Sequence, residues 1–307
     1  MHGYEKAGYR RYVLVLLTLV YAVNFVDRQL VAILQEAIKA DIGLSDTQLG
    51  LLTGFAFAMF YVLAGIPIAR LADRSNRRNI ISIAIAVWSC MTALSGMAGN
   101  FFQLLLARIG VGVGEAGCSP PAHSMISDMY PPRQRATALS FYSVGINIGI
   151  MVGFLLGGIL NQYFGWRVAF IVVGAPGVLI ALWFRFTVRE PQRGWSERVE
   201  VDTAHVAFGR VVQFIWSHKY LVHISLGAAM SSMAGYSISS WSASFFIRSH
   251  AVPTAELGAW LAVGVGIFGS IGTFGCGLLA DKLGVQNKRF YMWVPAIAIL
   301  CTIPPLY

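Results

Sequence analysis

The sequence predicts an all-α membrane protein with nine membrane-spanning helices, and three observations support this fold class. Of the 307 residues, 56% are hydrophobic and 12% are charged, whereas soluble domains carry roughly 25% charged residues. Nine apolar segments are long enough to cross roughly 30 Å of hydrocarbon as helices. No alternating strand pattern competes with them. The expected segments are 12–35, 48–71, 79–99, 101–128, 134–162, 167–187, 220–247, 256–280 and 290 to the end of the chain.

The distribution of basic residues predicts the orientation of these segments. Eighteen of the 23 Lys and Arg residues lie before the first segment or in connections on the same side, and only Lys39, Arg167 and Arg248 lie in connections on the other side. Cytoplasmic loops carry such an excess. We therefore expect an integral protein of an inner or plasma membrane with a cytoplasmic N-terminus. Because this segregation accounts for the formal charge of +9, no nucleic-acid partner is expected.

The long connection 188–219 separates a predicted six-helix bundle, 1–187, from an incomplete second bundle, 220–307. Apolar residues in this connection share one helical face, which favours a helix on the membrane surface over a structureless linker. The sequence "ARLADRSNRR" after the second segment returns as "GLLADKLGVQNKR" after the eighth, and places Asp73 and Asp281 208 residues apart. This internal repeat indicates two related bundles.

Two charged residues, Asp27 and Arg28, stand inside the first segment, where each costs roughly 2.5 to 3.5 kcal/mol on insertion scales. Arg108 and Glu115 lie nearly on one face of the fourth segment but about 10 Å apart along the axis, so we do not expect them to pair with each other. Asp27 is expected at a depth similar to that of Arg108, so a pair between the two helices is feasible. A purely structural ion network is the alternative, but ionisable residues inside a membrane favour function.

The second segment ends in a basic cluster that contains one acidic residue. Arginines suit the cytoplasmic end of a helix on topological grounds alone, but Asp73 adds nothing to that signal and returns as Asp281 in the repeat. We therefore predict that both clusters form gates, in which a carboxylate binds the other bundle and is released when the bundles rock. The candidate gating residues are Asp73, Arg74, Arg77, Arg78, Asp281 and Lys282.

The seventh segment contains the stretch "SSMAGYSISSWSAS", with seven serines and Gly235 around Tyr236 and Trp241. Serines in a helix often bond back to carbonyls of their own helix. A helix loosened by glycine can also line a cavity with its hydroxyls and aromatic rings. Both interpretations stay open. The repeat aligns Asp27 with a position near Gly235, so a central cavity is expected to be charged on the side of the first bundle alone.

Glycines recur every four residues in the fifth segment, at Gly145, Gly149, Gly153 and Gly157, which predicts close helix packing. Two G-x-G-x-x-G matches lie inside apolar segments and lack the strand and βαβ context of a dinucleotide site. The four cysteines lie in apolar segments without paired spacing, so neither a disulfide framework nor a zinc site is indicated. No cofactor or metal is expected. An intramembrane enzyme is not expected either, because the chain lacks H-E-x-x-H, G-x-S-x-G and P-loop motifs.

These motifs together resemble the major facilitator superfamily. The resemblance rests on "RLADRSNRR" with its repeat, on Arg108 in "ARIGVGVG", on the glycine-rich fifth segment and on "GWRVAF". Within this superfamily, "NFVDRQL", "LSDTQLGLL", "GEAG", "REPQRG" and "WSASFFIRSH" are similar to Spinster-like transporters. The superfamily has twelve helices, so nine spans indicate a fragment or a truncated product. Its loop motif usually carries glycine where this chain has Ala69 and Asn76, and the Gly-Pro of the antiporter pattern is absent from the fifth segment.

The resemblance implies a secondary transporter that works by alternating access, as a monomer in the lipid bilayer. It implies that Asp27 and Glu115 carry protons, and that Arg28 and Arg108 bind an anionic head group. Asn24, Tyr236 and Trp241 are further candidates for substrate binding. Family members move amphipathic lipids such as lysophospholipids or sphingosine phosphate. The alternatives are an organic anion:proton symporter of the same superfamily and a non-transporting membrane partner or sensor.

Overall fold

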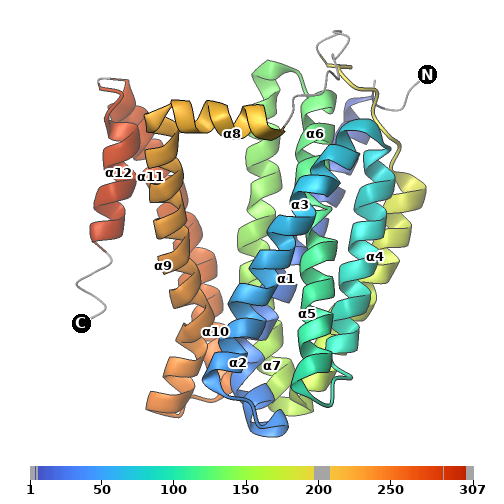
Figure 1. The fold of residues 1–307 in the computed structure, drawn as a ribbon, viewed down its shortest axis with the longest axis vertical. Coiled ribbons are helices and arrows are strands. Elements are labelled where there is room, and N and C mark those ends of the chain that lie inside the picture. Colours follow the sequence, from blue (N-terminus) through green and yellow to red (C-terminus); the bar gives the residue numbers. More distant parts are fainter. Residues whose placement is uncertain (1–3, 5, 197–207, 286, 302–307) are drawn as a thin grey trace.

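The computed structural model describes residue 4 and residues 6–196, 208–285 and 287–301, and all regular elements in these ranges are helical. The described helices run nearly parallel, except α8, which lies across one end (Figure 1). They are α1 (Ala7–Ile42), α2 (Asp46–Gly50), η2 (Leu51–Phe55), α3 (Ala56–Arg74), α4 (Arg77–Ser95), α5 (Phe101–Ala116), α6 (Ser119–Met129), α7 (Pro132–Thr187), α8 (Phe208–Ser217), α9 (Lys219–His250), α10 (Thr254–Leu261), η3 (Ala262–Phe268), α11 (Gly269–Gly284) and α12 (Phe290–Leu300).

The all-helical membrane fold is confirmed. Six helical stretches in the described part of the chain are long and apolar enough to cross a membrane. They cover seven of the nine predicted segments, because α7 contains both the fifth and the sixth segment. The seventh and ninth segments form α9 and α12, which are not among the six. The end of the ninth segment, 302–307, and part of the predicted linker, 197–207, lie outside the described residues.

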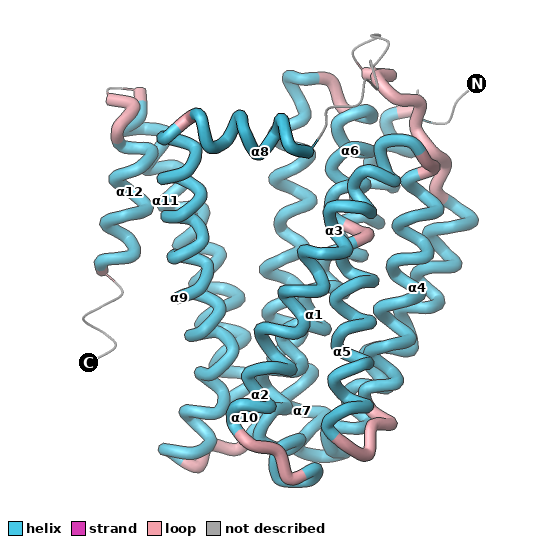
Figure 2. The backbone as a smooth tube through the Cα atoms, viewed as in Figure 1, coloured by secondary structure: helices cyan, strands magenta, loops and turns pink. Residues whose placement is uncertain are grey.

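Most loops lie at the two ends of the helices (Figure 2). We call the end that holds the N-terminus and α8 the upper end, and the end that holds α2 and the connection from α9 to α10 the lower end (Figure 1). At the upper end, α3 ends at Arg74, Ser75 is extended, and the side chain of Asn76 accepts a hydrogen bond from the backbone of Asn79. Asn76 therefore caps α4 and closes this turn without glycine.

Two predicted spans are interrupted for reasons that lie in the sequence. Segment 101–128 divides into α5 and α6, because prolines occupy the first turn of α6 and cannot continue the hydrogen-bond pattern of α5. Inside α7, Gly165 has φ 82° and ψ 164°, a conformation that glycine adopts without strain. Gly165 separates two arms, 132–164 and 166–187, as the predicted boundaries at 162 and 167 anticipated.

The hydrophobic core of the described residues consists of two clusters. The upper cluster contains Trp88, Tyr142 and Phe184, and the lower cluster contains Phe154 and Phe170. In α1, buried residues of the upper cluster end at position 20 and those of the lower cluster begin at position 30. The stretch between them holds the charged pair that the sequence places inside the membrane.

Candidate functional site

Asp27 lies in α1 between the two core clusters and is 1% exposed. Its Oδ2 accepts a hydrogen bond from Arg108 Nη1 of α5 at 3.0 Å. Its Oδ1 accepts from the hydroxyl of Thr92 in α4 at 2.7 Å. Both oxygens of this carboxylate are thus occupied by groups of the first six spans, which offsets part of the desolvation cost of burial.

Arg28 points from the neighbouring position of α1 toward a different set of partners. Its Nε donates to Oε2 of Glu115 at 2.7 Å, and Glu115 is fully buried. Its Nη1 lies 3.5 Å from the hydroxyl of Tyr236 in α9. Adjacent residues of a helix point in directions about 100° apart, so the four charges form two separate ion pairs. One pair is sealed within the first six spans, and the other meets α9.

Aromatic rings surround the guanidinium group of Arg28. Its central carbon lies 4.9 Å from the ring centre of Phe25 and 5.1 Å from those of Phe57 and Tyr61. Phe57 also lies 5.4 Å from the central carbon of Arg108. Contacts of this kind stabilise a desolvated cation by up to about 2 kcal/mol. These rings were not among the predicted site residues, although Phe57 and Tyr61 lie one helical turn apart on α3.

Several buried polar atoms at this site have no hydrogen-bond partner within the described residues. They are Asn24 Nδ2, Glu115 Oε1 and Arg108 Nε. An unsatisfied buried polar atom costs about 1–3 kcal/mol, so three among these residues are expensive for a site whose role is only structural. The arrangement leaves bonding capacity for a proton or for a polar ligand.

The serines of the seventh predicted span, α9, bond in two ways, and its role in lining a cavity stays a prediction. Ser237 and Ser242 donate to carbonyls of their own helix. Ser239 donates to Gln29 at 3.4 Å, and Ser244 donates to Glu36, so these two serines reach α1. Partners such as Ser244 and Glu36 are 208 residues apart, the offset of the internal repeat. Equivalent positions of the two halves therefore face each other at the same depth.

The lower end is closed by a network of charges that the sequence reasoning missed. Arg248 of α9 binds Glu36 of α1 at 2.8 Å and Asp46 of α2 at 2.6 Å. Lys39 also binds Asp46 at 2.7 Å. Trp241 belongs to this end, since the central carbon of Arg248 lies 6.0 Å from its ring centre. The structure therefore places Trp241 with the lower network, whereas Tyr236 lies with the central charges.

The upper end lacks a comparable closure in the described part of the chain. Residues 223–238 of α9 are all exposed. At the lower end, by contrast, a Cβ added at Gly258 of α10 would stand 2.4 Å from the carbonyl oxygen of Phe154 in α7. The described contacts between α9–α10 and the first six spans thus concentrate below the central charges, and the helices diverge above them (Figure 1).

The predicted gating residues divide into buried and exposed members. Arg77 is fully buried and donates to Glu190 at 2.7 Å, to Ser124 at 2.7 Å and to Asp128. It therefore ties the segment after α7 to α4 and α6 within the first six spans.

Other members of the predicted gates make fewer contacts. The backbone N–H of Arg78 also donates to Glu190, whereas Asp73, Arg74 and Lys282 are exposed. The side chain of Asp281 lies outside the described residues. The gating role of these residues stays a prediction.

The four glycines of the first arm of α7 lie against α1. Added Cβ atoms would stand 2.6 Å from the carbonyl oxygen of Thr18 at Gly145, 2.3 Å from that of Ala22 at Gly149, and 2.9 Å from that of Val26 at Gly153. At Gly157, the Cβ would stand 2.6 Å from the side chain of Ile33. The glycine stripe therefore sets the distance between α7 and the helix that carries Asp27 and Arg28.

Comparison with protein families and with known proteins finds several matches to this chain. Residues 17–306 match the family described as Major Facilitator Superfamily. The chain is 33% identical over 288 residues to an MFS-type efflux pump of Mycolicibacterium smegmatis, with 94% of this chain and 66% of the relative covered. It is 30% identical over 198 residues to the probable L-galactonate transporter of Escherichia coli, with 64% and 43% covered.

The fold resembles the crystal structure of a bacterial homolog to the human lysosomal transporter Spinster in an inward-facing and unoccupied conformation. The TM-score is 0.82 and the identity is 39%, with 92% of this chain and 64% of that chain covered. The chain thus spans 66% or less of the length of these relatives.

Proposed function

The chain belongs to the major facilitator superfamily, and from this membership we propose that it works by alternating access as a Spinster-like secondary transporter. The observation that carries the proposal is the division of four intramembrane charges into a sealed pair, Asp27–Arg108, and a pair that meets the other half, Arg28–Glu115. A purely structural network would not need its second pair at the boundary with α9. A transporter needs a charge there that responds when the halves separate.

We infer that the upper end is cytoplasmic and that the structure represents an inward-facing state of a monomer in an inner or plasma membrane. The excess of basic residues on one side supports this orientation. The ion network at Arg248 and the exposed residues 223–238 of α9 support closure at the lower end. The buried contacts of Arg77 and the exposed Asp73 are compatible with an upper gate that is released in this state.

Glu115 and Asp27 are the proposed proton carriers. Glu115 is the stronger candidate, because its Oε1 has no partner within the described residues while both oxygens of Asp27 are bonded. Protonation of Glu115 removes the negative charge that holds Arg28. The freed guanidinium can then bind an anionic head group through charge-assisted hydrogen bonds.

The proposed cargo is an amphipathic anionic lipid, such as a lysophospholipid or sphingosine phosphate. Arg28 supplies the positive charge, and Phe25, Phe57 and Tyr61 supply apolar surface around it. The exposed Met230 and Met233 of α9 add flexible side chains that can pack against an acyl chain.

Transport in liposomes under an imposed pH gradient tests the proton carriers. We expect Glu115→Gln to abolish the response to the gradient and Asp27→Asn to weaken it, because an amide cannot take up and release the proton. Ser237→Ala is the matched control, since Ser237 bonds only to its own helix and should keep the response. An unchanged pH dependence of transport in both carboxylate variants would contradict the proposal that Glu115 and Asp27 carry protons.

The second candidate is an organic anion:proton symporter, which the similarity to the probable L-galactonate transporter favours. The same liposomes separate the two cargo classes when lysolipids and small carboxylates are offered in parallel. Transport of carboxylates alone selects the symporter. Absence of counterflow for both classes in correctly inserted protein selects the non-transporting partner or sensor.

A further inference from the structure

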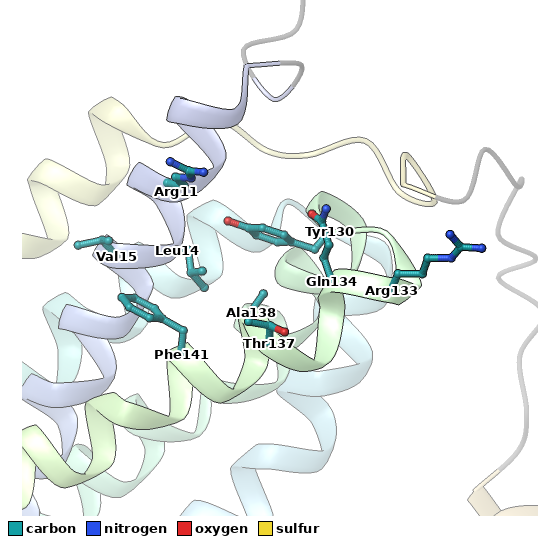
Figure 3. A pocket seen from close by; sticks show the side chains of 9 residues that line it. All are labelled: Arg11, Leu14, Val15, Tyr130, Arg133, Gln134, Thr137, Ala138 and Phe141. Carbon is teal, nitrogen blue, oxygen red and sulfur yellow. The ribbon is translucent and has the colours of Figure 1, made fainter.

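A cavity at the upper end lies apart from the central charges. It has a volume of about 420 Å³ and is formed by the start of α1 and the start of α7 (Figure 3). Its lower part is lined by Leu14, Val15 and Phe141, so that apolar side chains form the wall that continues along the two helices. None of the residues that line it is acidic.

The polar part of this cavity carries positive charge that no acidic residue in the described part of the chain neutralises. Arg11 and Arg133 form ion pairs with no acidic residue among the described residues, and both are exposed. They stand directly before the predicted membrane segments that begin at 12 and 134, the depth at which lipid head groups lie. Arg11 stands on the α1 side of the cavity, whereas Arg133 lies at the α7 rim with its guanidinium directed away from the cavity (Figure 3).

A buried hydroxyl lies at the edge of the same cavity. The ring of Tyr130 lies across it with the hydroxyl directed toward α1 (Figure 3). This oxygen is buried and has no hydrogen-bond partner within the described residues. Burial raises the pKa of Tyr130, although Arg10 and Arg11 lower it in part, so at neutral pH the group is an uncharged donor. A buried donor without a partner costs free energy, and an acceptor from a ligand would remove that cost.

We propose that this cavity binds one anionic glycerophospholipid of the surrounding bilayer, separately from the transported cargo. Arg11 and the hydroxyl of Tyr130 bind the phosphate, Arg133 adds positive charge at the rim, and an acyl chain lies along Val15 and Phe141. A zwitterionic lipid presents a choline or ethanolamine cation to the same arginines, so the site discriminates by head-group charge. The apolar wall favours a lipid over a free phosphate, because only the lipid has an acyl chain that can contact this wall.

Native mass spectrometry of the full chain tests this proposal with phosphatidylglycerol and phosphatidylcholine of identical acyl chains. We expect the wild-type protein to retain one phosphatidylglycerol at least about tenfold more tightly than phosphatidylcholine, the ratio that one charge-assisted hydrogen bond supplies. The preference should vanish in Arg11→Gln/Arg133→Gln. Tyr130→Phe should weaken phosphatidylglycerol binding by several-fold while it leaves phosphatidylcholine binding unchanged.

The control is Arg185→Gln/Arg189→Gln, which removes the same net charge from exposed positions near the same end without altering the cavity. This variant should keep the preference for phosphatidylglycerol. Equal loss in the control and cavity variants would show a general charge effect and overturn the proposal. Complete displacement of the lipid by water-soluble glycerol phosphate would overturn it as well, because it would identify a site for a free anion.

Discussion

Arg108→Ala is expected to lower the melting temperature of the purified protein by on the order of 10 °C, because removal of one partner from a buried ion pair costs about 3–5 kcal/mol. Asp27 is 1% exposed and Arg108 2% exposed, so water cannot replace the lost partner. The carboxyl group must then stay charged without a counterion or take up a proton. Thermal unfolding in a single detergent measures the shift.

A second substitution distinguishes loss of the pair from loss of side-chain volume. Arg108→Gln combined with Asp27→Asn removes both charges and keeps polar groups in contact, so it should restore most of the stability. Thr92→Val is the matched control, because it removes only the hydrogen bond from a neutral hydroxyl to the Asp27 carboxylate and should cost about 1.5–3 kcal/mol, less than loss of the counterion. If the double variant is no more stable than Arg108→Ala, the two charges are not energetically coupled.

Gly149→Leu is expected to reduce the yield of folded, monodisperse protein and to abolish transport. A Cβ at Gly149 would stand 2.3 Å from the carbonyl oxygen of Ala22 and 2.6 Å from Cβ of Phe25. Neither atom belongs to a flexible side-chain end, so α1 must move away from α7. Overpacking costs about 1–3 kcal/mol or more, and here it also displaces the helix that carries Asp27 and Arg28.

Gly65→Ala serves as the control for this prediction. An added Cβ at Gly65 of α3 meets no atom within 4 Å, and alanine favours a helix over glycine by about 1 kcal/mol. Size-exclusion chromatography and thermal unfolding should therefore show unchanged or raised stability for Gly65→Ala. A comparable loss in both variants would mean that the glycine stripe does not set the distance between α1 and α7.

Local patterns predicted the helices and made one of the ion pairs feasible. Apolar runs located the spans, and counting turns placed Asp27 at the depth of Arg108, which is where the structure pairs them. The pair Arg28–Glu115 was not predicted. Depth along a helix can be counted from the sequence, but the direction in which a side chain points depends on how each helix is rotated against its neighbours.

Contacts between distant charges outside the apolar segments were also missed. Arg77 contacts Glu190, 113 residues further along the chain, and Arg248 contacts Glu36, 212 residues earlier. In the sequence, Arg77 stands in the basic cluster of the predicted gate and Arg248 is one of three basic residues on the opposite side, so nothing marks Glu190 or Glu36 as their partners. Arg77 meets Glu190 because the chain after α7 passes beside α4, and Arg248 meets Glu36 because of how α9 is aligned along α1.

The exposure of the lower network has a consequence for kinetics. Arg248 is 37% exposed at its side chain and Asp46 52% exposed, so dissolved ions reach this bridge, and the Debye length is about 8 Å at physiological ionic strength. Salt on the lower side of the membrane should therefore speed the opening of that end, whereas salt on the upper side should not. The turnover rate would then sense the salinity of one compartment alone, and Arg248→Gln should remove that sensitivity in liposomes with asymmetric salt.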